Sequence, residues 1–136
     1  MNTTTLLRVA AAISLLFACG HAMGGRKDWS PMGETDILKA MREVRFDTMG
    51  VSRTYLDFYR GLGHSLTVFM LLETVVLWQL AAIAKTDPAQ ARPMIASFTL
   101  ATIASGVVSW LFLFPAPAIF SAILATCLGA AFVLAG

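Results

Sequence analysis

The chain contains four long apolar stretches, at residues 5–23, 60–84, 94–114 and 117–135. A transmembrane helix needs about 20 mostly apolar residues in a row, so each stretch is long enough, or nearly so, to cross a bilayer. The composition agrees, because 57% of the residues are hydrophobic and only 13% are charged, against about 25% in an average soluble protein. We therefore predict an all-α fold, a membrane-embedded four-helix bundle that forms one domain over residues 1–136.

Local signals predict several helix ends. The segment "KTDPAQARP" separates the second and third spans, with Asp87 as N-cap and Pro88 as the first residue of the next helix. The two prolines of "FPAP" predict a tight turn into the fourth span. The second helix should begin near Ser52, well before its apolar run, because only two glycines interrupt it. Its first turns would carry aromatic residues at the membrane surface: Tyr55, Phe58 and Tyr59.

The first span also has features of a secretory signal peptide. Arg8 precedes the apolar run "VAAAISLLFACG", and "LFAC" is similar to the end of a lipid-attachment box, although Phe17 is bulky where a small residue is usual. Two interpretations stay open: an uncleaved anchor, or a signal peptide whose removal leaves three spans. Cys19 and Cys127 would lie at different depths, so we expect two buried thiols rather than a disulfide.

The polar residues are concentrated in the loop between the first two spans, residues 24–52. After the irregular segment "GGRKDWSPMG", apolar residues from Ile37 to Val44 recur at helical spacing, and Gly50 would end the helix. We predict an amphipathic helix in this loop. The helix would either lie in the membrane interface or cover the mouth of the bundle as a lid, and both alternatives stay open.

Small residues recur at four-residue spacing in three of the spans. Such ridges let helix backbones approach closely in a membrane, where lipid provides no hydrophobic force between helices. We expect a tightly packed bundle, and the same ridges favour packing with a second copy or with another membrane protein. The ridges are Ala10, Ser14, Ala18 and Ala22; Ser97, Ala101, Ser105 and Ser109; and Ser121, Ala125 and Gly129.

One carboxylate, Glu73, interrupts the apolar run "LLETVVLWQL". It follows Arg60 by about 13 residues, which at about 1.5 Å per residue places it near the middle of the bilayer. A charge is costly there, so we expect the side chain to face the bundle interior and often to be protonated. Glu73 is then either a structural link or a group that carries a proton or holds a ligand. Its expected partners are hydroxyl groups at the same depth: Ser14, Thr102, Ser105 and Thr126.

A second polar group lies where the second span enters the membrane. His21, at the end of the first span, would come close to His64 at this face. Two histidines at equal depth can hold haem, and with Asp57 they can hold a metal ion. The alternative is that the histidines bond to backbone or headgroups and that the charged residues form exposed ion pairs. Because residues seven apart are nearly in line on a helix, one stripe contains Arg53, Asp57, Arg60, Gly61 and His64.

The sequence contains no motif that identifies a cofactor, a metal or a reaction. Cys-x-x-Cys-His and Glu-x-x-His are missing, and there is no third histidine. We therefore expect no cofactor and no metal. The net charge of +2, without a basic patch, excludes nucleic acid as a partner. The candidate binding residues are His21, Asp57, Arg60, His64 and Glu73.

Several segments resemble a known family. The runs "LLFACGHAMGG", "WSP", "LKAMREVRFDTMG", "SRTYLDFYRGLG" and "VVLWQLAAIAKTDPAQARP" are similar to an uncharacterised family of small bacterial four-helix integral membrane proteins, over nearly the whole chain. Leu56 departs from the family pattern, where an aromatic residue is common, and His64 is not part of it. The resemblance implies the fold and a bacterial membrane location, and it implies no activity. The matching positions are His21, Trp29, Pro31, Asp57, Tyr59 and Gly61.

Three hypotheses for the function remain. The first, which we rank highest, is non-enzymatic: packing with itself or a partner protein, or binding a lipid or isoprenoid. The second is a haem or metal redox protein that uses His21 and His64. The third is a membrane enzyme or proton-coupled carrier that uses Glu73.

We expect a multi-pass protein of the bacterial inner membrane, with the lipid bilayer itself as its main partner. Its orientation stays open. Seven of the ten Lys and Arg residues lie between the first two apolar runs when the loop is counted up to Arg60, which favours a cytoplasmic loop. The signal-like first helix argues for the opposite orientation.

Overall fold

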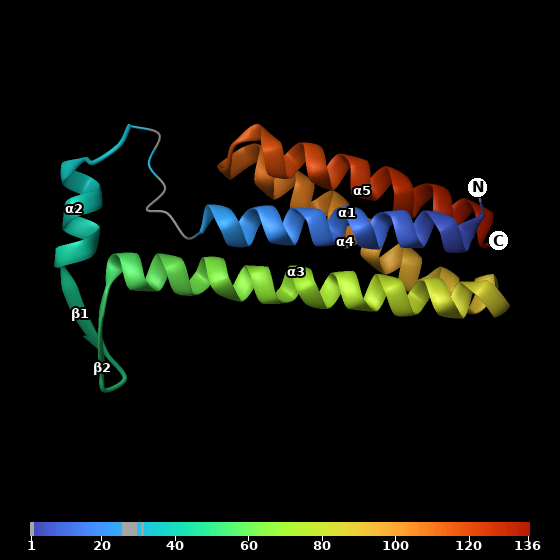
Figure 1. Ribbon diagram of the computed structural model, residues 1–136, viewed down its shortest axis with the longest axis horizontal. Coiled ribbons are helices and arrows are strands. Elements are labelled where there is room, and N and C mark those ends of the chain that lie inside the picture. The colour runs from blue at the N-terminus through green and yellow to red at the C-terminus, as the bar shows by residue number, and fades with distance from the viewer. Residues whose placement is uncertain (1, 26–29, 31) are drawn as a thin grey trace. The chain divides into compact units, whose positions relative to one another are not determined.

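The computed structural model describes residues 2–25, 30 and 32–136. These residues form five helices and one two-stranded antiparallel sheet (Figure 1). Trp29 and Pro31, two positions on which the expected family resemblance depends, lie outside the described residues, as does part of the irregular segment before the second helix. The elements are α1 (Thr3–Gly24), α2 (Asp36–Glu43), β1 (Arg45–Thr48), β2 (Val51–Thr54), α3 (Tyr55–Thr86), α4 (Pro88–Phe112) and α5 (Pro115–Leu134).

Within the described residues, four helices are long and apolar enough to cross a membrane: α1, α3, α4 and α5. They coincide with the four predicted apolar spans. Their outer faces carry large apolar side chains that are more than half exposed, among them Leu72, Trp110 and Phe112. Soluble monomeric proteins rarely expose contiguous apolar surface of this extent, so these faces suit contact with lipid.

The ends of α4 agree with the sequence signals. The Asp87 carboxylate accepts a hydrogen bond from the backbone N–H of Gln90 at 3.0 Å, and Pro88 is the first residue of the helix. This confirms the predicted N-cap. The helix ends at Phe112, and only residues 113–114 separate it from α5. The predicted tight turn is therefore confirmed as well.

A β-hairpin follows α2, so the prediction of an all-α fold is wrong at this point. The strands β1 and β2 pair antiparallel, with Arg45 opposite Thr54. The loop between them is Met49–Gly50, and both residues have positive φ, at 49° and 80°. A two-residue loop with two positive φ angles is a type I′ turn, whose twist matches that of the flanking strands.

The hairpin corrects two helix ends. The amphipathic helix α2 ends at Glu43 instead of continuing to Gly50, and α3 begins at Tyr55 rather than near Ser52. The change occurs at Val44, whose backbone is extended (φ −72°, ψ 120°). β-branched residues such as those in β2 favour a pleated strand over a helix, and pairing with β1 stabilises that choice.

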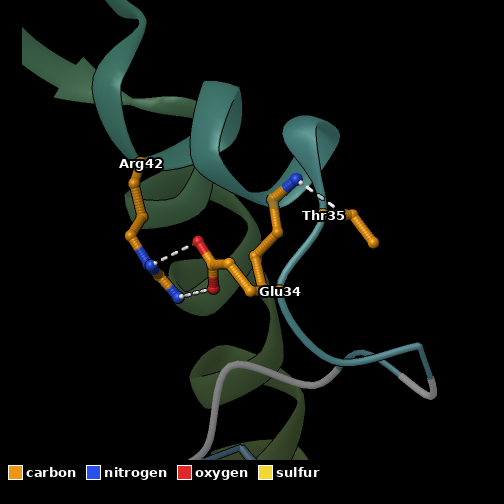
Figure 2. A network of polar contacts seen from close by, with 4 residues as sticks. Glu34, Thr35 and Arg42 are labelled. Carbon is orange, nitrogen blue, oxygen red and sulfur yellow. Dashed lines mark hydrogen bonds and ion pairs between the residues drawn. The ribbon is translucent and has the colours of Figure 1, made fainter.

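Two polar contacts stabilise the short helix α2: one caps its N-terminus, and the other joins its last turn to the residue before the cap. Thr35 is the N-cap, and its hydroxyl accepts a hydrogen bond from the backbone N–H of Leu38 at 3.2 Å. The Arg42 guanidinium donates two hydrogen bonds to the Glu34 carboxylate, at 2.9 and 3.1 Å (Figure 2). Leu38 is the buried residue of the helix. These contacts confirm the predicted amphipathic helix, while its location as an interfacial helix or a lid stays a prediction.

The chain divides into two compact units. One comprises Met1–Phe17 and Met70–Gly136, and the other comprises Ala18–Phe69. The first unit contains an apolar core to which all four long helices contribute. The prediction of a single domain over residues 1–136 stays a prediction. The largest fully buried apolar side chains of the core are Leu7, Leu77, Leu80, Ile95 and Leu128.

Three of the four members of the predicted α1 ridge are buried, whereas three of the four members of the predicted α4 ridge are exposed. In α1, Ala10, Ser14 and Ala18 are all buried. In α4, Ser97, Ala101 and Ser105 are exposed. A strict four-residue spacing rotates by about 40° around the helix at each step, because an α-helix has 3.6 residues per turn. The buried residues of α4 are instead spaced by four or seven positions, and they are Ala91, Ile95, Thr102 and Ser109.

Helices α4 and α5 approach each other closely at Gly106 of α4 and Ser121 of α5. A Cβ atom built on Gly106 would lie 3.1 Å from the Cβ of Ser121, which is tighter than ordinary van der Waals contact. Ser121, on the predicted α5 ridge, is buried. Small residues thus bring these two helices together as they do in membrane proteins generally, although the α4 partner is Gly106 rather than a member of the predicted ridge.

The two cysteines differ from each other in exposure. Both are free thiols, Cys19 is exposed and Cys127 is half-buried against the core. The expectation of two buried thiols is therefore wrong for Cys19. It directly follows buried Ala18, and one residue along an α-helix turns the side chain by about 100°, away from the packed face.

Candidate functional site

Glu73 lies in a polar layer between the parts of α1 and α3 that belong to the first unit. The Ser14 hydroxyl lies 3.1 Å from Glu73 Oε2 and 3.5 Å from the backbone oxygen of Met70. Ser14 is buried and Glu73 is half-buried. Of the hydroxyl partners expected from the sequence, the structure brings Ser14 to the carboxylate. Thr126 instead donates to the backbone oxygen of Ala122 in its own helix, at 2.7 Å.

Thr74, which was not predicted from the sequence, is the third side chain of this layer. Its hydroxyl lies 3.1 Å from the Ser14 hydroxyl and 3.0 Å from the Met70 backbone oxygen. Thr74 directly follows Glu73 and is half-buried. A second polar residue beside an acid within an apolar run was the available signal. We define the polar layer as Ser14, Glu73, Thr74 and the Met70 backbone oxygen.

The second unit holds a pair of histidines near the end of α1. His21 Nδ1 lies 2.8 Å from the Thr67 hydroxyl, which also lies 3.2 Å from the backbone oxygen of Gly63. A hydroxyl group has one proton to donate. When Thr67 donates to Gly63, it accepts from His21, which assigns the imidazole proton to Nδ1. Thr67 is a partner that the sequence analysis did not identify.

The structure places His64 at the same end of α1 as His21. Gly25, directly after α1, is close to both residues. A Cβ atom built on Gly25 would lie 3.9 Å from His64 Cε1 and 3.5 Å from the backbone oxygen of His21. The predicted approach of the two histidines is therefore confirmed. The described residues contain no group of three or more His, Cys, Asp or Glu side chains that would hold a metal ion. Haem binding by this pair stays a prediction.

Asp57 forms a reciprocal capping pair with Thr54 at the start of α3. The Thr54 hydroxyl accepts from the Asp57 backbone N–H, and the Asp57 carboxylate accepts from the Thr54 backbone N–H, both at 3.0 Å. This is a capping box, which satisfies backbone donors that a helix start leaves free. This capping role explains the position of the Asp57 carboxylate, and no bound ligand is needed to explain it.

Part of the predicted stripe lines a shallow groove in the second unit. The groove has a volume of about 280 Å³, and Arg53, Asp57 and Gly61 line it together with Phe58. The capping contacts hold the Asp57 carboxylate at the start of α3. The groove is smaller than the clefts of about 300–1,000 Å³ that usually bind small molecules.

A larger cleft lies at one end of the first unit. Its volume is about 610 Å³, and the cations Arg8 and Lys85 line it. Arg8 also lies over the Trp78 ring, with its guanidinium carbon 5.6 Å from the ring centre. The sequence analysis did not identify this cleft. Arg8 and Lys85 belong to neighbouring antiparallel spans, which was the available signal. The remaining lining residues are Asn2, Thr3, Thr4, Thr5, Ala84, Pro88 and Leu134.

Comparisons with protein-family models, with curated proteins and with solved structures find no match to this chain. The family resemblance of the sequence therefore stays a prediction. Three groups of side chains are the candidates for function: the cleft beside Arg8 and Lys85, the polar layer around Glu73, and the histidine pair His21 and His64.

Proposed function

We propose that this chain is a non-enzymatic, multi-pass protein of the bacterial inner membrane that binds a lipid with an anionic headgroup. The observation that carries the proposal is the cleft beside Arg8 and Lys85 in the first unit. Four apolar helices support the membrane location, and the family resemblance of the sequence supports a bacterial inner membrane. The lipid would bind at the end of the helices that carries Arg8 and Lys85, where this end meets the headgroup region of the bilayer.

The charges around the cleft favour an anion. Arg8 and Lys85 line it, and the residues described in its lining include no carboxylate. Asp87 and Arg92 lie nearby in sequence: the Asp87 carboxylate caps α4, and the Arg92 guanidinium carbon is 4.5 Å from the centre of the Phe132 ring. Arginine and lysine near a membrane surface attract anionic lipids, at about 1 kcal/mol for each cation. A phosphate group would find two cations within one cleft.

The lining is also amphipathic in the way a lipid requires. Thr4 and Thr5 add hydroxyl groups beside the cations, whereas Ala84, Pro88 and Leu134 add apolar surface. A headgroup phosphate would contact the polar side and the first carbons of the acyl chains would contact the apolar side. The described lining has no carboxylate or imidazole that would act as a general base, which favours binding over catalysis.

Native mass spectrometry of the protein, released from gentle detergent after reconstitution with phosphatidylglycerol and phosphatidylcholine, tests this function. We expect phosphatidylglycerol to stay bound in stoichiometric amount and phosphatidylcholine to be lost. The double variant Arg8→Gln, Lys85→Gln should lose the phosphatidylglycerol adduct. Lys39→Gln, which removes an exposed cation of α2 far from this cleft in sequence, is the matched control and should keep it.

Equal retention of both lipids, or an unchanged adduct in the double variant, would contradict the proposal. Inorganic phosphate in excess distinguishes a lipid headgroup from free phosphate as the ligand. It should displace phosphatidylglycerol only if the cleft recognises free phosphate without the lipid chains. An absorption spectrum of the same sample tests the histidine pair. A Soret band that His21→Ala removes would replace lipid binding with a haem protein as the best hypothesis.

A further inference from the structure

The polar layer around Glu73 lies in the middle of two apolar helices. Ser14 stands about halfway along α1, and its hydroxyl contacts all three other groups of the layer, at 3.1 to 3.5 Å. The neighbouring α3 residues on the same face, Met70 and Leu77, are buried and apolar. A carboxyl group at this depth is a candidate functional group, because an uncompensated charge in an apolar environment costs several kcal/mol and needs a reason to be there.

The other charged side chains described in the first unit are Arg8, Lys85, Arg92 and Asp87, whose carboxylate caps α4. Arg8 precedes Ser14 by six residues, or about 9 Å along α1, and Lys85 follows Glu73 by twelve residues, or about 18 Å along α3. Arg92 is the only charged residue of α4, and α5 has none, with the Cys127 thiol as its only titratable group. Among the described residues, the side chain that bonds to the Glu73 carboxyl group is the Ser14 hydroxyl, which itself lies 3.1 Å from the Thr74 hydroxyl, and no counter-ion bonds to Glu73.

The hydroxyl groups of the layer can serve the carboxyl group in both of its protonation states. When Glu73 is ionised, Thr74 donates to Ser14 and Ser14 donates to Glu73 Oε2. When Glu73 carries a proton, it donates to Ser14, while Ser14 and Thr74 both donate to the Met70 backbone oxygen. Each hydroxyl donates one hydrogen bond in either arrangement, as its single proton requires. All of these contacts already exist as distances of 3.0 to 3.5 Å.

We propose that the Ser14, Glu73 and Thr74 layer is an exchangeable proton-binding site, in which the Ser14 hydroxyl reverses its hydrogen bond when Glu73 gains or loses a proton. The proton binds at Oε2, and a water molecule that enters the bundle from the membrane surface accepts it when the site releases it. Rotation of two hydroxyl groups is sufficient, so the helices keep their positions. The site is independent of the lipid cleft, and it survives if the cleft binds nothing.

Modification by dicyclohexylcarbodiimide tests the proposal on the full chain in liposomes. This reagent adds to protonated carboxyl groups in apolar surroundings, and peptide mass spectrometry locates the adduct. We expect at least tenfold more modification at Glu73 than at Asp87, an exposed carboxylate of the same unit. The modification of Glu73 should decrease steadily from mildly acidic to alkaline pH. Glu73→Gln should remove the adduct altogether.

Ser14→Ala tests the part played by the hydroxyl group. It should alter the pH profile of the modification, because it removes the group that changes its hydrogen bond. Thr126→Ala is the matched control, since that hydroxyl bonds within α5, and it should leave the profile unchanged. An unchanged profile in Ser14→Ala would overturn the hydrogen-bond reversal.

Infrared spectroscopy of the wild-type protein keeps the proposal testable if Ser14→Ala fails to fold. An exchangeable site shows a carboxylic acid C=O band that gives way to carboxylate bands as the pH rises, and Glu73→Gln lacks both changes. A Glu73 signal that does not vary with pH, in either experiment, would overturn the proposal and make the layer a static structural contact.

Discussion

The Ser14 hydroxyl lies 3.1 Å from Oε2 of Glu73, across the seam between α1 and α3, although 59 positions separate the two residues in the chain. Ser14 belongs to the buried small-residue ridge of α1, with Ala10 and Ala18. Small side chains let the two helices approach closely enough for a short hydroxyl group to reach the carboxyl group. The ridge and the isolated acid are thus parts of one contact.

Ser14→Ala should lower the free energy of unfolding of the protein in detergent by about 0.6 kcal/mol, the average for hydrogen bonds between membrane helices, and by no more than about 2 kcal/mol. The reason is that Glu73 loses its partner from α1. Unfolding in a denaturing detergent series measures the change. The control Thr126→Ala removes a hydroxyl that bonds only within its own helix. Equal effects of the two variants would show that the bond between α1 and α3 contributes nothing.

Gly106→Leu should destabilise the pair of helices α4 and α5. Even a Cβ atom at Gly106 would approach the Cβ of Ser121 to 3.1 Å, so a larger side chain forces the helices apart, at a cost of about 1–3 kcal/mol. The same unfolding assay measures it. Gly20→Leu is the matched control, because nothing lies within 4 Å of a Cβ atom at Gly20. A tolerated Gly106→Leu would disprove close packing at this point.

Met49→Asn should stabilise the hairpin. Met49 has a positive φ of 49°, which costs an ordinary L-residue about 1–2 kcal/mol, and Asn-Gly is the preferred pair for a type I′ turn. Gly50→Ala should have the opposite effect, because φ is 80° at Gly50. Amide hydrogen exchange of β1 and β2 reports both changes. Slower exchange in Gly50→Ala than in the wild type would contradict the turn assignment.

Thr54→Ala and Asp57→Ala should each weaken the start of α3 by about 1 kcal/mol, the usual cost of losing an N-terminal cap. The double variant should lose less than the sum, because both bonds stabilise the same first turn, and a turn already loosened by one substitution loses less when the second bond is removed. Hydrogen exchange over the first turn of α3 measures the three variants. Ser65→Ala, an exposed position of the same helix, serves as control. Strict additivity would show that the two bonds act independently.

The long helices were predictable because their signal is one-dimensional. Length and hydrophobicity define a span residue by residue, and the Asp87 cap depends on Pro88 and other near neighbours in the chain. The hairpin was not predictable in the same way. A helical pattern of apolar residues runs up to Val44, and the pairing of Arg45 with Thr54 ends it, which requires two segments to meet.

The candidate sites also contain some features that the sequence predicts and others that only the packed structure shows. The sequence identified Glu73, Ser14 and the approach of His21 to His64, because unusual residues in apolar runs are visible without a structure. It did not identify Thr74 as part of the polar layer or the cleft beside Arg8 and Lys85. Both depend on how helices rotate about their axes, which small differences in packing decide. A strict four-residue spacing also predicted the wrong face for α4, where Ser97 is exposed.

The sequence by itself determined that this protein has four helices able to cross a membrane, where they begin and end within a few residues, and that one acid lies deep within a span. Hydrophobicity and capping act between near neighbours, so the chain order carries that information. Only the tertiary structure decided which hydroxyl groups meet Glu73 and which cations share a cleft. Those contacts join residues tens of positions apart, such as Ser14 and Glu73, and they exist only once the helices have packed.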